Sequence, residues 1–378
     1  MPDAKIPWWR TDLGAAEIAG LEQAVRGRHI NGGPLCRALE ERLAAELGAP
    51  HMVLTTSGSV ALLLALLACD VGPGDEVVLP AGGFIAAAHA VRLLGAAVRL
   101  VDLRDDRPLL DAGRLAAALS PRTKAIVPIH LNGQACDLDA IRAVAAAHGV
   151  RVVEDCAQAF GSRDAAGACL GTRGGFGAFS MGMTKLVTTG EGGFVATPDA
   201  GAAARLRKLR NQGVEVMARN VFEGFGFNFR FNDLLAAVGL AQVAALPRKL
   251  EALRRVRAFY AGRLAGLGGV RLLENAPGEV PLWTAVLCAR RNDVATALAA
   301  RGIETRAFHP PLSDSAHLGC AGDFPRARYF AAHGLVLPSG PDQRLEDLER
   351  TADAMRAACR EGPVPPPPAA AAEGDPHA

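Results

Sequence analysis

The sequence predicts an α/β protein in which a mostly parallel sheet lies between helices. Short runs of β-branched and apolar residues alternate with helical patterns through the first two-thirds of the chain. Such alternation is typical of parallel strands linked by crossover helices. The chain has 378 residues, of which 50% are hydrophobic, so it is long enough for two or three domains with a sizeable core. This composition excludes a fibrous or disordered protein.

The expected elements follow one another at short intervals. Helical patterns cover residues 34–48, 59–69, 85–94 and 137–148. Strand patterns cover residues 52–56, 76–80, 97–102, 125–130, 151–155, 176–180 and 193–197. Open sheets of this kind bind their ligands at the carboxyl ends of the strands. Residues at those ends are therefore the first candidates for a ligand site.

A smaller α+β domain is expected after a long helical segment that begins at Asn232 and reaches about Leu264. Pro247 lies inside this segment and lacks a backbone donor, so it should break or kink the helix. We place the domain boundary there, with residues 1–246 forming the large domain and residues 247–360 the small one. The patterns of the small domain are a strand at 281–288 and helices at 291–301 and 344–359.

Charge and composition narrow the function classes. The formal net charge is +2, which gives no excess of basic residues for nucleic acid or an anionic membrane. No apolar stretch approaches the roughly 20 residues that span a bilayer, and the N-terminus lacks a signal-peptide pattern. Eight cysteines without a CxxC pair favour reduced thiols over disulfides or a metal site. We expect a cytoplasmic protein that binds small molecules and no metal, with residues 361–378 as a disordered Pro/Ala-rich tail.

The turn at residues 55–59, Thr-Thr-Ser-Gly-Ser, suggests a phosphate site. It joins a strand pattern to a helical pattern, and free backbone N–H groups at a helix start can bind an anion. Such a turn is more often a plain helix cap. It matches neither the Walker A motif nor the dinucleotide fingerprint, so a simple nucleotide-binding fold is the poorer interpretation.

An acid and an amine accompany this turn. Asp155 ends a strand pattern, although a helix cap explains its position equally well. Lys185 lies in an apolar, Thr-rich segment, whereas Lys208 and Lys249 lie among arginines on helix faces expected to be polar. Lys124 is expected to be exposed in a turn. A lysine in a dry loop can act as a free amine, a carboxylate can hold a pyridine nitrogen protonated, and a turn can anchor a phosphate. These are the minimum requirements for pyridoxal phosphate.

Several motifs, taken in order, resemble those of the DegT/DnrJ/StrS aminotransferases from about Ile6 to Met355. They are TTSGSVALLLAL, GPGDEVVLP, PRTKAIVPIHLNGQ, VVEDCAQAFGS, FSMGMTKLVTTGEGG, RKLRNQG and FNFRFNDLLAAVGLAQ. The resemblance implies a pyridoxal-phosphate enzyme of fold type I (aspartate aminotransferase-like) that aminates keto-sugar nucleotides or, in one branch, keto-cyclitols. It also implies a homodimer with shared active sites.

The resemblance assigns roles to individual residues. Lys185 would form the Schiff base with pyridoxal 5'-phosphate, Asp155 would pair with the pyridinium nitrogen, and Gln158 would lie beside the ring hydroxyl. The phosphate would be held by Gly58, Ser59 and Ser180.

Two further cofactor contacts are implied, each with a plain structural alternative. Phe84 would stack on the ring, although an aromatic at the start of an Ala-rich helix is more often a core residue. Asn228 would reach the phosphate of the neighbouring subunit, although it could simply cap the helix near Asn232. Arg230, Arg306 and His309 are candidates for binding an anionic acceptor.

The runs KLVTTGEGG, IETRAFHPPL and LVLPSG most resemble the perosamine-type branch, which makes 4-amino sugars. We therefore expect transfer of an amino group from L-glutamate to a nucleotide-linked keto-deoxy sugar. Alternatives are a keto-cyclitol or another natural-product ketone as acceptor, or a regulatory protein that binds pyridoxal phosphate. The family's dehydratases replace the lysine by His, so Lys185 argues against that activity. Departures from the family pattern at the acceptor pocket are Gly82, Gly83, Asn132, Met181 and Met183.

Overall fold

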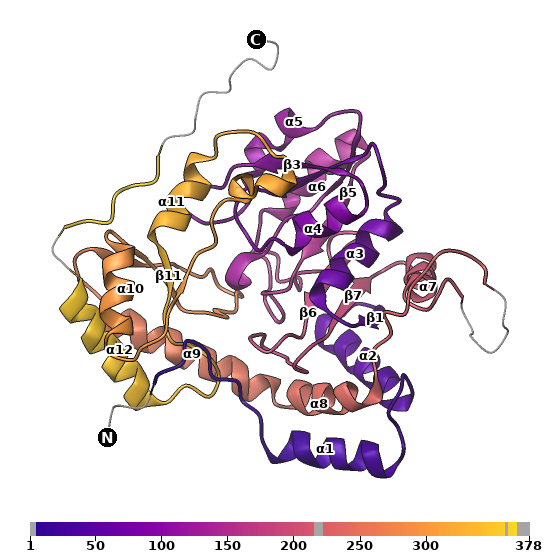
Figure 1. Ribbon diagram of the computed structural model, residues 1–378, viewed down its shortest axis with the longest axis horizontal. Coiled ribbons are helices and arrows are strands. Elements are labelled where there is room, and N and C mark those ends of the chain that lie inside the picture. Colours follow the sequence, from indigo (N-terminus) through magenta and orange to yellow (C-terminus); the bar gives the residue numbers. More distant parts are fainter. Residues whose placement is uncertain (1–4, 215–221, 360–361, 369–378) are drawn as a thin grey trace.

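A seven-stranded sheet forms the centre of the larger of two structural units (Figure 1). The computed structural model describes residues 5–214, 222–359 and 362–368. The strands of the large sheet lie in the order β1-β7-β6-β5-β4-β2-β3. Their bounds are β1 His51–Thr55, β2 Glu76–Pro80, β3 Ala97–Val101, β4 Thr123–Ile126, β5 Arg151–Asp155, β6 Phe176–Ser180 and β7 Gly193–Thr197. All neighbouring pairs are parallel except those of β7, which runs against both β6 and β1. The expected mostly parallel sheet is confirmed.

Helices cover both faces of this sheet. They are α1 Ala15–Arg26, α2 Pro34–Leu47, α3 Gly58–Ala68, α4 Ala86–Leu93, α5 Leu115–Ala118, α6 Leu138–His148, α7 Ala200–Leu209 and α8 Asp233–Ala244. Alternate side chains of a strand point to opposite faces, so Val153 of β5 packs against α3 and α4, whereas Val152 packs against α6. The helix α3 is apolar almost all round because it is buried between the sheet and its neighbouring helices.

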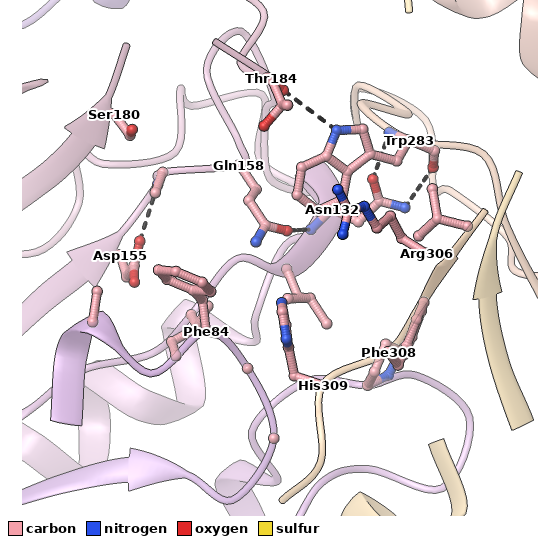
Figure 2. Close-up of a pocket in the computed structure, with 18 of the residues that line it drawn as sticks. Phe84, Asn132, Asp155, Gln158, Ser180, Thr184, Trp283, Arg306, Phe308 and His309 are labelled. Carbon is pink, nitrogen blue, oxygen red and sulfur yellow. Dashed lines mark hydrogen bonds between the residues drawn. The ribbon is translucent and has the colours of Figure 1, made fainter. Parts of the chain in front are cut away.

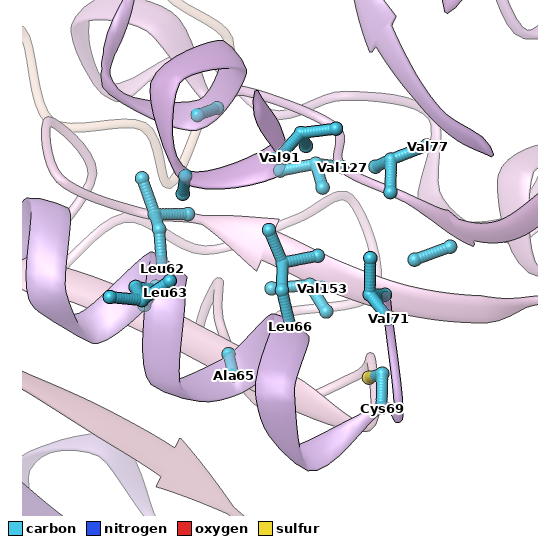
Figure 3. Close-up of a cluster of buried hydrophobic side chains, with 14 of the residues drawn as sticks. Leu62, Leu63, Ala65, Leu66, Cys69, Val71, Val77, Val91, Val127 and Val153 are labelled. Atoms are coloured by element: carbon cyan, nitrogen blue, oxygen red, sulfur yellow. The ribbon is translucent and has the colours of Figure 1, made fainter. Parts of the chain in front are cut away.

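Figure 3 shows the packing around α3. Leu62 and Leu66 lie with Val91 of α4 and with Val127 and Val153 on the sheet. Burial of each such leucine contributes about 1.5–3 kcal/mol. This packing holds the first turn of α3 in a fixed place at the edge of the sheet.

The smaller unit contains an antiparallel sheet in the order β10-β11-β9-β8. Its elements are β8 Val270–Leu272, β9 Ala285–Cys288, β10 Arg306–Ala307, β11 Gly334–Val336, α9 Leu246–Arg263, α10 Arg291–Ala299, α11 Pro325–His333 and α12 Leu345–Ala358. Short 3-10 turns lie at Ala112–Arg114, Leu131–Gly133, Leu312–Asp314 and Ala316–Leu318. Its core joins Tyr260, Leu298 and Met355 to Ile6 near the N-terminus, which forms a bridge with Ile303. The N-terminal stretch then runs beneath the large unit to α1 (Figure 1).

The long helical segment breaks where Pro247 predicts it. The helix α8 ends at Ala244, Ala245 links the two helices, and Pro247 lies in the first turn of α9, where its missing N–H is tolerated. The limits 1–246 and 247–360 of the two domains remain a prediction. In the expected tail, residues 362–368 form no helix or strand, and the Pro365 carbonyl accepts a hydrogen bond from Tyr329 Oη at 2.7 Å. Residues 361 and 369–378 lie outside the described residues. Among the helices that the structure describes, none combines the length and apolar character needed to cross a membrane.

Candidate active site

A cavity of about 420 Å³ lies between the two units, at the carboxyl ends of the parallel strands (Figure 2). The large unit and the small unit each supply part of its wall. The sequence-predicted residues that line it are Gly58, Ser59, Phe84, Asp155, Gln158, Ser180, Lys185, Arg306 and His309. The fold thus brings together side chains that are spread over some 250 positions of the chain.

Lys185 lies in the turn that follows β6, where its backbone N–H donates to the Gly182 carbonyl at 3.0 Å. Its Nζ lies 5.3 Å from the centre of the Trp283 ring. Burial lowers the pKa of Lys185 to about 8, and the nearby Asp155 carboxylate only partly opposes this shift. An amine with such a pKa is neutral in an appreciable fraction near neutral pH, as a nucleophile or base must be.

Asp155 ends β5 and is almost entirely buried. Burial raises the pKa of its carboxyl group, against the influence of the Ala157 N–H, Lys185 and His130. Its Oδ1 accepts a hydrogen bond from the Ala157 N–H at 3.0 Å, so Asp155 does cap the next turn while it faces the cavity. A buried carboxylate facing a cavity can hold a proton on a ligand nitrogen.

The preceding residue, Glu154, points to the other face of the sheet. It accepts hydrogen bonds from His130 Nε2 at 3.1 Å and from the N–H groups of Gly171, Arg173 and Gly174. The donor atoms of His130, Glu154 and Cys156 lie close enough together to suggest a metal site, but the Glu154 carboxylate is fully used by these N–H donors. The Glu154 carboxylate therefore ties His130 to the loop at residues 171–174.

The first turn of α3 forms the floor of the cavity. Ser57 caps the helix by accepting a hydrogen bond from the Val60 N–H at 3.2 Å, while Gly58 and Ser59 face the cavity. A Cβ atom on Gly58 would lie 2.6 Å from the Cβ of Ser180, so only glycine lets α3 and β6 approach this closely. Helix capping and an anion site thus coexist in one turn. This turn, the Asp155 acid and the Lys185 amine fit pyridoxal phosphate.

Phe84 projects into the cavity with 49% of its surface exposed, so it is not a core residue. Its ring meets the His309 ring edge to face, with 5.4 Å between centroids. Figure 2 shows Phe84 between Asp155 and His309, where it can cover one face of a planar ring. Gln158 also lines the cavity, and its Oε1 accepts a hydrogen bond from the Asn132 N–H at 2.8 Å.

The three candidates for acceptor binding separate into two groups. Arg306 and His309 line the cavity, and the Arg306 guanidinium lies over the Trp8 ring at 5.2 Å. Burial, together with the Lys185 and Arg306 cations, lowers the pKa of His309. Arg230 does not line this cavity; its Nε donates to Asn228 Oδ1 at 2.9 Å.

Asn228 is exposed and lies away from the cavity of its own chain. The helix cap suggested as its alternative role belongs to Asn232, whose Oδ1 accepts from the Leu235 N–H at 2.9 Å. The Asn228 side chain accepts a hydrogen bond from Arg230, and its backbone forms a bridge with Asn211. Asn228 is therefore available to a neighbouring molecule.

Asn132 and Trp283 form a contact that the sequence did not reveal. Asn132 Nδ2 donates to the Trp283 carbonyl and Asn132 Oδ1 accepts from the Trp283 N–H, both at 2.6 Å (Figure 2). The Trp283 indole in turn donates to the Thr184 carbonyl at 3.4 Å. The Asn132 side chain thus braces the wall beside Lys185. A lone Trp inside an apolar run gives no such signal in sequence.

The prediction that Lys249 lies on a polar helix face is wrong. Only 1% of its surface is exposed, and its Nζ donates to the Leu186 carbonyl at 3.2 Å and to Gln242 Oε1. The buried residues of α9 include Leu246, Lys249, Leu253, Val256 and Tyr260. This spacing of three and four places Lys249 on the inner stripe of the helix, despite the arginines around it.

Known proteins match this chain along most of its length. The pattern of the DegT/DnrJ/EryC1/StrS aminotransferase family matches residues 11–356. The chain is 38% identical to the GDP-perosamine synthase of Caulobacter vibrioides over 328 residues, which cover 84% of this chain and 88% of that protein. It is also 38% identical to the dTDP-3-amino-3,4,6-trideoxy-alpha-D-glucose transaminase of Streptomyces venezuelae over 338 residues, 87% of this chain and 88% of that protein.

Solved structures of aminotransferases match this chain in fold. An aminotransferase from Streptoalloteichus hindustanus matches with a TM-score of 0.90 and 30% identity, over 94% of this chain and 99% of that chain. The family match spans nearly the whole described chain, and the fold agrees over the same length. The chain therefore belongs to the DegT/DnrJ/EryC1/StrS family of pyridoxal-phosphate-dependent aminotransferases.

Proposed function

We propose that this aminotransferase moves an amino group from L-glutamate to the keto group of a nucleotide-linked keto-deoxy sugar, in the cytoplasm. The observation that carries the proposal is the cavity itself, which joins the Lys185 amine, the Asp155 acid and the α3 turn to a wall that holds Arg306. The two relatives described above are named for GDP-linked and dTDP-linked amino sugars. The choice of glutamate rests on the resemblance to the family.

The residues of the large unit divide the chemistry between them. When bound, pyridoxal phosphate supplies an aldehyde carbon and an electron-withdrawing ring. Lys185 would hold the cofactor through its Nζ and, once free, would take and return the proton of the reacting carbon, for which a pKa near 8 is well matched. Asp155 in its ionised form keeps the pyridine nitrogen protonated.

The remaining contacts hold and orient the cofactor. Gly58, Ser59 and Ser180 line the cavity at the start of α3 and would hold the phosphate. Phe84 would cover one face of the ring, and the Gln158 amide would bind the ring hydroxyl. The same residues serve both half-reactions, which run in opposite directions on donor and acceptor.

The small unit supplies the acceptor site. A guanidinium group pairs with a diphosphate in bidentate fashion, and the contact with Trp8 holds Arg306 at the cavity wall. Phe330 and Val336 of this unit, with Leu103 of the large unit, add an apolar surface that suits the carbon atoms a deoxy sugar leaves without hydroxyls. His309 has a lowered pKa, so its neutral ring can exchange hydrogen bonds with sugar hydroxyls.

A panel of ketone acceptors, offered to enzyme loaded with the amine form of the cofactor, tests the acceptor class. We expect turnover of nucleotide-linked keto sugars and little turnover of free keto-cyclitols or keto acids. Arg306→Ala should raise the KM for the sugar nucleotide by about 10-fold to 100-fold, because a lost charged hydrogen bond costs about 1.5–3 kcal/mol, while the KM for glutamate stays unchanged. Arg301→Ala removes an exposed arginine of the same unit and serves as the control.

Free keto-cyclitols that react as fast as any sugar nucleotide, with no effect of Arg306→Ala on either, would exclude the nucleotide-sugar acceptor. The activity of a keto-cyclitol aminotransferase would then remain. A protein that binds the cofactor but aminates no ketone in the panel would instead support a regulatory role.

A further inference from the structure

The turn that carries Lys185 is held by side-chain donors from three distant segments. Thr11 Oγ1 donates to the Met183 carbonyl at 3.0 Å, and Trp283 Nε1 donates to the Thr184 carbonyl at 3.4 Å. On the other side of the lysine, Lys249 Nζ donates to the Leu186 carbonyl at 3.2 Å. The backbone on both sides of Lys185 is therefore fixed from outside the turn.

Lys249 is the only one of these three donors that carries a charge, and it is buried. Its ammonium group also donates to Gln242 Oε1. The other end of that amide donates to Glu17 Oε1 at 2.8 Å and to the Asp12 carbonyl at 2.9 Å. The charged groups that face Lys249 are Asp12 and Glu17 in the N-terminal region and Arg248 beside it on α9. The neutral Gln242 amide therefore lies between the Lys249 ammonium group and the Glu17 carboxylate.

A buried ammonium group such as that of Lys249 is unfavourable for the stability of a fold. Lys249 lies on the stripe of α9 whose other members pack in apolar clusters, and burial lowers its pKa to about 8. A buried cation costs desolvation free energy, and an apolar side chain of similar size is often neutral or stabilising in its place. A buried charge bonded to the residue next to the catalytic amine therefore suggests a role in the reaction.

We propose that Lys249 is a positioning residue for Lys185, because its ammonium group holds the Leu186 carbonyl and so fixes the backbone from which the catalytic amine projects. The inference rests on the role of Lys185 proposed above. Lys249 does not line the cavity and touches neither substrate nor cofactor. It acts through one backbone carbonyl.

Lys249→Met tests the proposal, because Met keeps the length and apolar stem of the side chain but removes the charge and the donors. We expect the melting midpoint to equal or exceed that of the wild type, and kcat to fall at least 10-fold with little change in KM. Lys249→Gln retains an N–H donor and should recover part of the lost kcat. Arg254→Met removes an exposed cation from the same helix and should change none of these quantities.

A second readout needs neither cofactor nor turnover. The pH dependence of acetylation at Lys185, followed by peptide mass spectrometry in the cofactor-free enzyme, reports the pKa of that amine. The midpoint should lie near 8 in the wild type and rise by at least half a pH unit in Lys249→Met, because a loosened turn admits water.

Two results would overturn the proposal. One is a kcat and a Lys185 midpoint in Lys249→Met that equal those of Arg254→Met. The other is a drop in melting midpoint, or a failure to fold, that accounts for the lost activity, because that would make Lys249 a plain structural residue. Failure of the proposed function is recognised separately, since the cofactor would then be attached to a lysine other than Lys185 in the wild type.

Discussion

Asp155 and Lys185 show how burial sets the chemistry of single side chains. Asp155 ends β5 at the cavity and Lys185 follows β6, so adjacent parallel strands deliver an acid and an amine to the same edge of the sheet. Burial lowers the pKa of the lysine and raises that of the acid. A cationic pyridinium ring would favour the ionised form of Asp155, so the acid and the cofactor reinforce each other.

Asp155→Asn should keep the fold and lose most of the activity. The amide is nearly the same size and can still accept the hydrogen bond from the Ala157 N–H, but a neutral group cannot hold the pyridine nitrogen protonated. We expect a kcat at least 100-fold lower with an unchanged melting midpoint. A turnover within a few-fold of the wild type would show that Asp155 does not have this role.

The sequence predicted both of these residues but misplaced Lys249. Asp155 and Lys185 follow strand patterns, and the ends of parallel strands meet at one edge of a sheet. The orientation of Lys249 depends instead on the break at Ala245, where a new helix begins. Arg248 before the lysine and the arginines at 254, 255 and 257 after it hide the apolar stripe of α9. No local pattern shows that Gln242 and Leu186 lie opposite the lysine.

At the level of elements, the cavity depends on two close approaches. The start of α3 lies against the end of β6 because residue 58 is glycine. The wall opposite is fixed by Asn132, whose side chain takes both backbone groups of Trp283. The strand predicted at residues 281–288 covers fewer residues in the structure, because β9 begins at Ala285. Trp283 pairs with a side chain rather than a strand, and strand patterns cannot reveal such a partner.

Asn132→Gly tests this brace. Asn132 has a positive φ of 54°, which glycine adopts without strain, so the change mainly removes the amide. The Trp283 N–H and carbonyl then lose their partners, which should lower the free energy of unfolding by about 1–3 kcal/mol. Denaturant unfolding measures this loss. An unchanged stability would show that water or another residue replaces the amide.

At the level of the whole molecule, both units are needed to complete one cavity. Ile6 joins the core of the small unit and α1 packs against α8 of the large one, so the N-terminal segment links the two. Asn228 and Arg230 lie outside the cavity of their own chain. The family resemblance predicts a homodimer with shared sites, in which the exposed Asn228 would meet the partner subunit.

Subunit mixing tests the shared site. Lys185→Ala and Asn228→Ala subunits should each be inactive or weak, because one lacks the amine and the other lacks a phosphate contact. A heterodimer of the two has one site with both residues intact, so mixing should restore part of the activity. No recovery after verified subunit exchange would place Asn228 outside the partner's site.

The identity of the cofactor lysine tests the whole account most directly. The holoenzyme is reduced with borohydride, digested, and the peptide that carries the cofactor is identified by mass spectrometry. We predict a single adduct on Lys185, and its loss together with the visible absorbance band in Lys185→Ala. The second buried amine, Lys249, also has a pKa near 8 and provides an internal comparison. An adduct on Lys249 or on any other lysine would contradict the account.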